Sequence, residues 1–257
     1  TLGAFTKYPK ASIPIRPSSH VSDKKFGFFQ EQQHDFFEVA DNLGTKKNDN
    51  KILRHPLAYL VEAADDICYT LIDFEDGINL GWISEDYALE YLINLVRDRI
   101  DSKKYKILST KKDRLSYLRA LSINTLILEV SEIFMNNELE ILSGKLKESL
   151  IKKSKYKAQM EDIINLSILK IYQAPEVIDK ELKGYQVINR LLDVFVGATI
   201  RNSKNLATAF DNLSLSCLPK NLINYESDNT YKILLNVSSY IASLTDGKAL
   251  EWYNKMS

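Results

Sequence analysis

The chain has 257 residues, of which 45% are hydrophobic and 26% charged, a composition typical of a globular protein with a sizeable core. Lysine plus arginine equals aspartate plus glutamate, at 34 each, so no overall charge favours a nucleic-acid or membrane partner. No apolar run reaches the roughly 20 residues that a membrane helix needs. The two cysteines and the lack of a signal-peptide pattern indicate a reducing, cytoplasmic location.

Residues 1–22 are expected to form an extended loop, because Pro9, Pro14 and Pro17 interrupt any helix. Beyond this loop proline and glycine are scarce, and the apolar residues keep helical spacing. The sequence therefore predicts an all-α fold. The expected helices span residues 27–43, 56–80, 84–101, 111–136, 138–150, 155–173, 175–201, 204–213, 228–243 and 246–255.

Some of these helices are apolar on most faces, which is typical of the buried helices of a bundle. They lie at residues 121–135, 163–172 and 187–200. A division of the chain is expected near residues 103–110, where a lysine-rich segment interrupts the pattern. Residues 1–102 would then belong to a catalytic half, and residues 103–257 to a helical C-terminal region.

The most informative segment is residues 54–81, RHPLAYLVEAADDICYTLIDFEDGINLG. Pro56 suits a first helical turn, and Gly77 or Gly81 could end the helix. One predicted face is apolar, and it includes a buried thiol: Val61, Ala64, Ile67, Cys68, Leu71 and Ile72. A separate stripe is acidic: Glu62, Asp65, Asp66, Tyr69, Asp73 and Asp76. Like charges at these spacings repel, so solvent, basic side chains or a metal ion must compensate them.

This segment resembles a motif of the HD-domain phosphohydrolases, specifically the deoxyguanosine triphosphate triphosphohydrolase (dGTPase) family, in which EAADDI is followed by Tyr and D-x-E-D. The opening TLGAFTKYP and the C-terminal SYIASLTDGKALEWY resemble two further segments of that family. In the last segment Leu244 replaces the usual Met, and Gly247-Lys248 replace a more typical Arg-aromatic pair. The resemblance spans nearly the whole chain and implies an HD-domain-type helical bundle.

The family's metal site is built from a His, a later His-Asp pair and a distant Asp. This chain has only His20, His34 and His55. His34 does precede Asp35, but downstream of the KYP segment, where the family places no ligand; we interpret it as a chance dipeptide. The remaining metal ligands and the catalytic groups are therefore expected upstream of Thr1, in a longer enzyme, and the chain alone is expected to be inactive.

The resemblance implies that Asp65 is a metal ligand, for a divalent ion such as Mg or Mn. It favours Asp65 over Asp66, which projects about 100° further round the helix; a solvated carboxylate is the alternative. Tyr69 and Asp73 follow Asp65 by one and two helical turns on the same face, and the resemblance implies that they face the deoxyribose. The alternative is a core tyrosine and a surface aspartate.

The resemblance also implies that Lys7 and Tyr8, in TKYP, and less directly Lys25, bind the triphosphate. An ammonium group and a phenol donor suit phosphate oxygens. Two lysine-rich segments, residues 103–112 and 152–157, are predicted to be solvated surface. Binding of phosphates or single strands is the alternative for them.

The leading hypothesis is the C-terminal portion of a deoxynucleoside triphosphate (dNTP) triphosphohydrolase, which hydrolyses dGTP or another dNTP to the deoxynucleoside and inorganic triphosphate. The expected partners are the dNTP, further copies of the protein in a homo-oligomer, and an effector nucleotide or single-stranded nucleic acid, but no membrane. Two alternatives stay open: an HD phosphohydrolase with another nucleotide substrate, and a non-catalytic helical module that binds nucleotides or partner subunits.

Overall fold

In a computed structural model, the chain is described at residues 2–12, 21–47, 51–225 and 229–256. Within these ranges the regular elements are all helices, joined by loops that contain two isolated β-bridges. The all-α prediction is confirmed. The chain divides into two compact units, Thr1–Ala174 and Pro175–Ser257. None of the described helices is long and apolar enough to cross a membrane.

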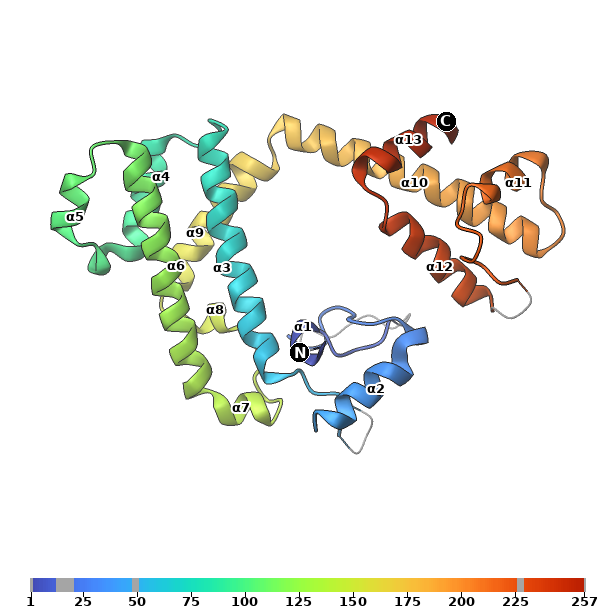
Figure 1. The fold of residues 1–257 in the computed structure, drawn as a ribbon. Helices are drawn as coiled ribbons and strands as arrows, with labels where there is room; N and C mark the ends of the chain where they lie inside the picture. The colour runs from blue at the N-terminus through green and yellow to red at the C-terminus, as the bar shows by residue number, and fades with distance from the viewer. Residues whose placement is uncertain (1, 13–20, 48–50, 226–228, 257) are drawn as a thin grey trace. The chain divides into compact units, whose positions relative to one another are not determined.

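The first unit is built around two long helices, α3 (Pro56–Asn79) and α6 (Lys111–Asn136), which pack against each other (Figure 1). Helix α4 (Glu85–Val96) packs against α6, helix α9 (Lys157–Ser167) packs against α3, and α4 and α9 pack against each other. The shorter helices are α1 (Leu2–Phe5), η1 (Gln30–Gln32), α2 (Gln33–Asn42), η2 (Arg97–Arg99), α5 (Ser102–Ile107), α7 (Glu138–Leu142) and α8 (Leu150–Lys153).

Helix α3 begins as its sequence predicts. The Nδ1 atom of His55, the N-cap residue, accepts a hydrogen bond from the Leu57 amide at 3.2 Å, and Pro56 occupies the first turn. The helix continues through Gly77 to Asn79, and Gly81 follows it with a φ of 78°. A left-handed glycine just beyond the last turn is a common helix terminator.

The packed face of α3 differs in part from the predicted one. Ile67 and Leu71 are buried as expected, and they share the buried face with Phe74. Ala64, Cys68 and Ile72, however, are exposed, so the prediction of a buried thiol was wrong. Helix α3 is apolar on two adjoining faces, and its partner helices cover only one of them.

Helix α9 is followed directly by a turn of a different helix type. After Ser167 the chain continues as a π-helix, Ile168–Tyr172. This turn comes close to Gly77 of α3, where a β-carbon would lie only 2.5 Å from Cδ1 of Ile171. Gly77 therefore permits a close approach of the two segments. π-Helical turns are rare, and they occur frequently at functional sites.

The second unit consists of one long helix, α10 (Pro175–Ser203), against which α11 (Ala209–Ser216), α12 (Thr230–Ala242) and α13 (Asp246–Met256) pack. Its core is apolar and includes Leu191, Phe195 and Val237.

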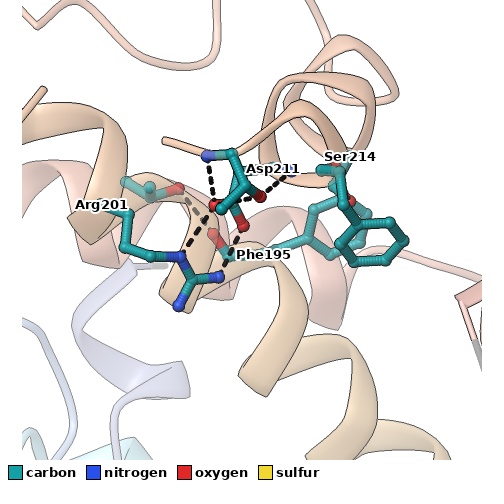
Figure 2. Close-up of polar contacts among 7 residues, drawn as sticks. Phe195, Arg201, Asp211 and Ser214 are labelled. Carbon is teal, nitrogen blue, oxygen red and sulfur yellow. Dashed lines mark hydrogen bonds and ion pairs between the residues drawn. The ribbon is translucent and has the colours of Figure 1, made fainter. Parts of the chain in front are cut away.

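A buried carboxylate connects α10 to α11 (Figure 2). Arg201 donates from Nε and Nη2 to the Asp211 carboxylate, at 2.8 and 2.6 Å. Thr208 and Asp211 also form a capping box at the start of α11. The guanidinium of Arg201, followed by the Thr208 amide, holds the pKa of Asp211 well below its usual range.

Several expected helix limits were wrong. Residues 27–29, 143–149 and 204–208 are not helical. Helix α4 ends at Val96, but the 3₁₀-helix η2 continues to Arg99, close to the expected end near residue 101. The expected loop at residues 1–22 contains the short helix α1, and its residues 13–20 lie outside the described part. The lysine-rich segment at residues 103–110 lies within the first compact unit. The expected division there, between a catalytic half and a helical C-terminal region, stays a prediction.

Candidate functional site

A cavity of about 510 Å³ opens within the first unit. Helix α3 forms one wall with Asp65, Asp66, Tyr69 and Thr70. The other wall comes from the segment that begins just before α8 and runs through α9 to Tyr172. A volume of this size is ordinary for a small-molecule site.

The two walls run in the same direction along the chain. The Tyr59 hydroxyl donates to the Leu146 carbonyl at 3.3 Å, near the start of α3. Further along both segments, the Tyr172 hydroxyl donates to Oδ2 of Asp73 at 2.6 Å. The residues around α8 and the start of α9 therefore lie toward the Asp65 end of the cavity, whereas Tyr172 lies at the Tyr69 end.

At the Asp65 end of the cavity, the structure brings together two residues that the sequence assigned to one site, Asp65 and Lys7, although Lys7 itself is not among the residues that line the cavity. Nζ of Lys7 lies 2.8 Å from Oδ2 of Asp65, whose side chain is 64% exposed. Burial lowers the pKa of Lys7, but the hydrogen bond to Asp65 and the surrounding carboxylates outweigh it, so that pKa is raised overall. Lys7 is thus held in its charged form beside the predicted metal ligand.

The next two carboxylates of the acidic stripe are less accessible than Asp65. Glu62 is buried, and its Oε2 lies 2.8 Å from Nη2 of Arg54, whose guanidinium stacks over the Tyr59 ring. Burial, followed by the charge of Glu62, raises the pKa of Asp66. Three carboxylates of the stripe have a partner that offsets the expected repulsion: Arg54 at Glu62, Lys7 at Asp65 and Tyr172 at Asp73. Asp66 still feels its acidic neighbours, which add to the effect of burial in raising its pKa.

At the second end of the cavity, two tyrosine rings lie near one carboxylate. The rings of Tyr69 and Tyr172 are 6.5 Å apart, and Tyr69 is 61% exposed. Burial, followed by the hydrogen bond to Asp73, raises the pKa of Tyr172. Sequence reasoning missed Tyr172. The only signal in the sequence was that Tyr172 ends the apolar stretch 163–172. In a regular α-helix its side chain would project in a different direction.

Tyr8 and Lys25 stand apart from the cavity. Tyr8 is half-buried and Lys25 is exposed, and neither side chain is among the residues that line the cavity. Their backbones are neighbours, because the Gly27 amide donates to the Lys10 carbonyl at 2.9 Å. The structure thus places the Lys25 loop beside the segment that carries Lys7 and Tyr8.

The described residues supply only part of a metal site. Among the described residues, no group of three or more His, Cys, Asp or Glu side chains has a suitable arrangement. His34 and Asp35 are exposed on α2, at 91% and 86% of their side chains, while His55 caps α3. His20 lies outside the described residues. Asp65 can therefore supply one carboxylate, but the described residues do not form a complete metal site.

Comparison with known proteins identifies relatives along the whole chain, although no protein-family model matches it. A "deoxyguanosinetriphosphate triphosphohydrolase-like protein" of Synechocystis sp. is 32% identical over 263 residues, which cover 100% of this chain. One of Listeria monocytogenes is 29% identical over 280 residues. A "deoxyguanosinetriphosphate triphosphohydrolase" of Yersinia pestis is 27% identical over 213 residues, 76% of this chain and 41% of its own length.

The all-α fold and the motif on α3 agree with the class that the sequence predicted, the helical HD-type phosphohydrolases. Within that class, the similarity along the whole chain shows that it is homologous to a portion of the dGTPase-like proteins. The chain spans 58% and 59% of the length of the Synechocystis and Listeria proteins.

Proposed function

We propose that this chain is part of a dNTP triphosphohydrolase, which hydrolyses dGTP or another dNTP to the deoxynucleoside and inorganic triphosphate. The observation that carries the proposal is the cavity along α3, where Asp65 and Tyr69 lie on one wall and Tyr172 on the other. The similarity to dGTPase-like proteins supports the same function.

The phosphate end of this site would be organised by Asp65 and Lys7. Asp65 would give one ligand to a divalent ion, Mg or Mn, and the other ligands would come from outside the described residues. When bound, such an ion activates water and neutralises phosphate charge. Lys7 now pairs with Asp65 at 2.8 Å, and it would turn to the phosphate oxygens once Asp65 is engaged. Tyr8 and Lys25 would add donors from the neighbouring loop.

The sugar end would be organised by Tyr69, Asp73 and Tyr172. Asp73 accepts one hydrogen bond from Tyr172, and a carboxylate has further lone pairs for the 3′-hydroxyl of a deoxyribose. The two tyrosine rings, 6.5 Å apart, would flank the sugar, and Tyr69 would exclude a 2′-hydroxyl by its bulk. This arrangement favours deoxynucleotides over ribonucleotides.

Chromatography of the products tests the function. The intact protein that carries this chain is incubated with Mg or Mn and a panel of deoxy- and ribonucleoside triphosphates. We expect the deoxynucleoside and inorganic triphosphate in equal amounts, and little turnover of ribonucleotides. Release of monophosphate or pyrophosphate would indicate an HD phosphohydrolase of another kind. Nucleotide binding without turnover would indicate the non-catalytic alternative.

Substitution of Tyr69 tests the sugar assignment separately. Tyr69→Ala should narrow the difference in kcat/KM between deoxy- and ribonucleotides, because the barrier to a 2′-hydroxyl is removed. Unchanged discrimination, with fold and metal content preserved, would contradict the role of Tyr69.

The remaining parts of the proposal come from the sequence and the family resemblance. Residues 1–102 would contribute to the catalytic half and residues 103–257 would form the helical C-terminal region. The protein would act in the cytoplasm as a homo-oligomer, with an effector nucleotide or single-stranded nucleic acid as a further partner.

A further inference from the structure

We propose that Lys152 and Lys157 bind the phosphate tail of the substrate from the cavity wall opposite Asp65. This inference rests on the proposed function and adds two phosphate-binding residues to it. The sequence predicted that the segment containing them, residues 152–157, is solvated surface. The structure separates the lysines of that segment into two kinds.

Lys152 and Lys157 line the cavity, whereas the other two lysines of the segment pair with acidic residues elsewhere. Nζ of Lys155 lies 3.1 Å from Oε2 of Glu129 on α6, and Nζ of Lys153 lies 3.8 Å from Oε2 of Glu140 on α7. Lys153 and Lys155 thus form ion pairs with neighbouring helices, whereas Lys152 and Lys157 line the cavity.

The lysines that line the cavity are only weakly engaged. Lys157 makes a 3.8 Å ion pair with Glu161, one helical turn further on, and its side chain is 48% exposed. Lys152 is exposed, and within the described part of the chain its ammonium group makes no hydrogen bond or ion pair; only its backbone amide is bonded, to the Ser149 carbonyl. Both ammonium groups can therefore turn toward a ligand without breaking a strong contact.

The direction of the two walls places these lysines at the phosphate end. Residues 146–172 run alongside α3 in the same sense, from the contact at Tyr59 to the contact at Asp73. A nucleotide whose sugar lies between Tyr69 and Tyr172 therefore extends its phosphates toward Asp65 and toward the two lysines.

Charge also favours this assignment. The cavity contains three carboxylates, of Asp65, Asp66 and Glu161, which would repel a triphosphate. Ammonium groups offset that repulsion and form charge-assisted hydrogen bonds with phosphate oxygens. Because the lysines are partly exposed to solvent, each contact should contribute roughly two- to fivefold in affinity.

Calorimetric titration of the intact protein with inorganic tripolyphosphate tests the inference. Lys152→Ala and Lys157→Ala should each weaken binding roughly two- to fivefold, and the double variant about tenfold. Lys152→Gln and Lys157→Gln should weaken binding as much as the alanine variants do, because glutamine keeps a polar side chain but not the positive charge. Lys170→Ala is the matched control, because Lys170 is exposed in the same stretch but does not line the cavity.

A second measurement separates a phosphate contact from general damage. The affinity for the product deoxynucleoside should be unchanged in all variants, since it carries no phosphate. If the double variant binds tripolyphosphate as tightly as the wild type, or loses deoxynucleoside affinity equally, the inference is wrong. Absence of dNTP turnover in the wild type would instead overturn the proposed function, and the tripolyphosphate titration would still decide the role of the lysines.

Discussion

The Tyr172 hydroxyl, in the π-helical turn, donates a hydrogen bond of 2.6 Å to Oδ2 of Asp73 on α3. Tyr172→Phe removes only the hydroxyl oxygen and keeps the ring beside Tyr69. A hydrogen bond to a charged acceptor contributes about 1.5–3 kcal/mol to stability. Both side chains are half-buried, and solvent weakens such an interaction. We therefore expect the coupling between them to be about 1–2 kcal/mol.

A double-mutant cycle measures this coupling directly. The free energy of unfolding in urea is determined for the intact wild type, Tyr172→Phe, Asp73→Ala and the double variant. The double variant should be less destabilised than the sum of the two single variants by about 1–2 kcal/mol. Additive effects would show that the hydroxyl and the carboxylate do not interact in solution, and would remove Tyr172 from the sugar end of the site.

Further predictions concern close packing and charge. Gly77→Ala should destabilise the protein by about 1–3 kcal/mol in urea unfolding, less the gain in helix propensity, because its β-carbon would lie 2.5 Å from Ile171. Gly184→Ala, where a β-carbon meets nothing within 4 Å, should instead stabilise by about 0.5–1 kcal/mol; equal effects at the two glycines would contradict the packing. Asp211→Asn should lower the thermal midpoint most above about pH 5 and progressively less as the pH falls below the unfolded pKa of about 4. The reason is that the depressed folded pKa of Asp211 makes its pairing with Arg201 stabilising only while the carboxylate is charged; a difference independent of pH would refute this.

The sequence predicted the parts of the molecule that local chemistry determines. Pro56 and Gly81 mark the two ends of α3 through backbone rules that need no tertiary information. The motif on α3 and the TKYP segment placed Asp65 and Lys7 in one site, and the structure pairs them at 2.8 Å. The roles of these two residues stay a prediction.

The parts that the sequence did not predict depend on tertiary packing. Helix α3 has two adjoining apolar faces, and only its partner helices decide that Ile67 is buried and Cys68 exposed. Tyr172 depends on the π-helical turn that starts at Ile168. Because a π-turn contains more residues than an α-turn, it rotates the following side chains away from the direction that regular helical spacing predicts.

The most direct test of the proposed site compares Asp65→Ala with Asp66→Ala in the intact protein. Metal content, by mass spectrometry after dialysis against Mg or Mn, is measured together with the release of inorganic triphosphate from dNTPs. Asp65→Ala should lose both bound metal and turnover, whereas Asp66→Ala should retain its metal and show the milder loss of activity. If Asp66→Ala loses metal while Asp65→Ala keeps it, the assignment of Asp65 as the metal ligand is contradicted.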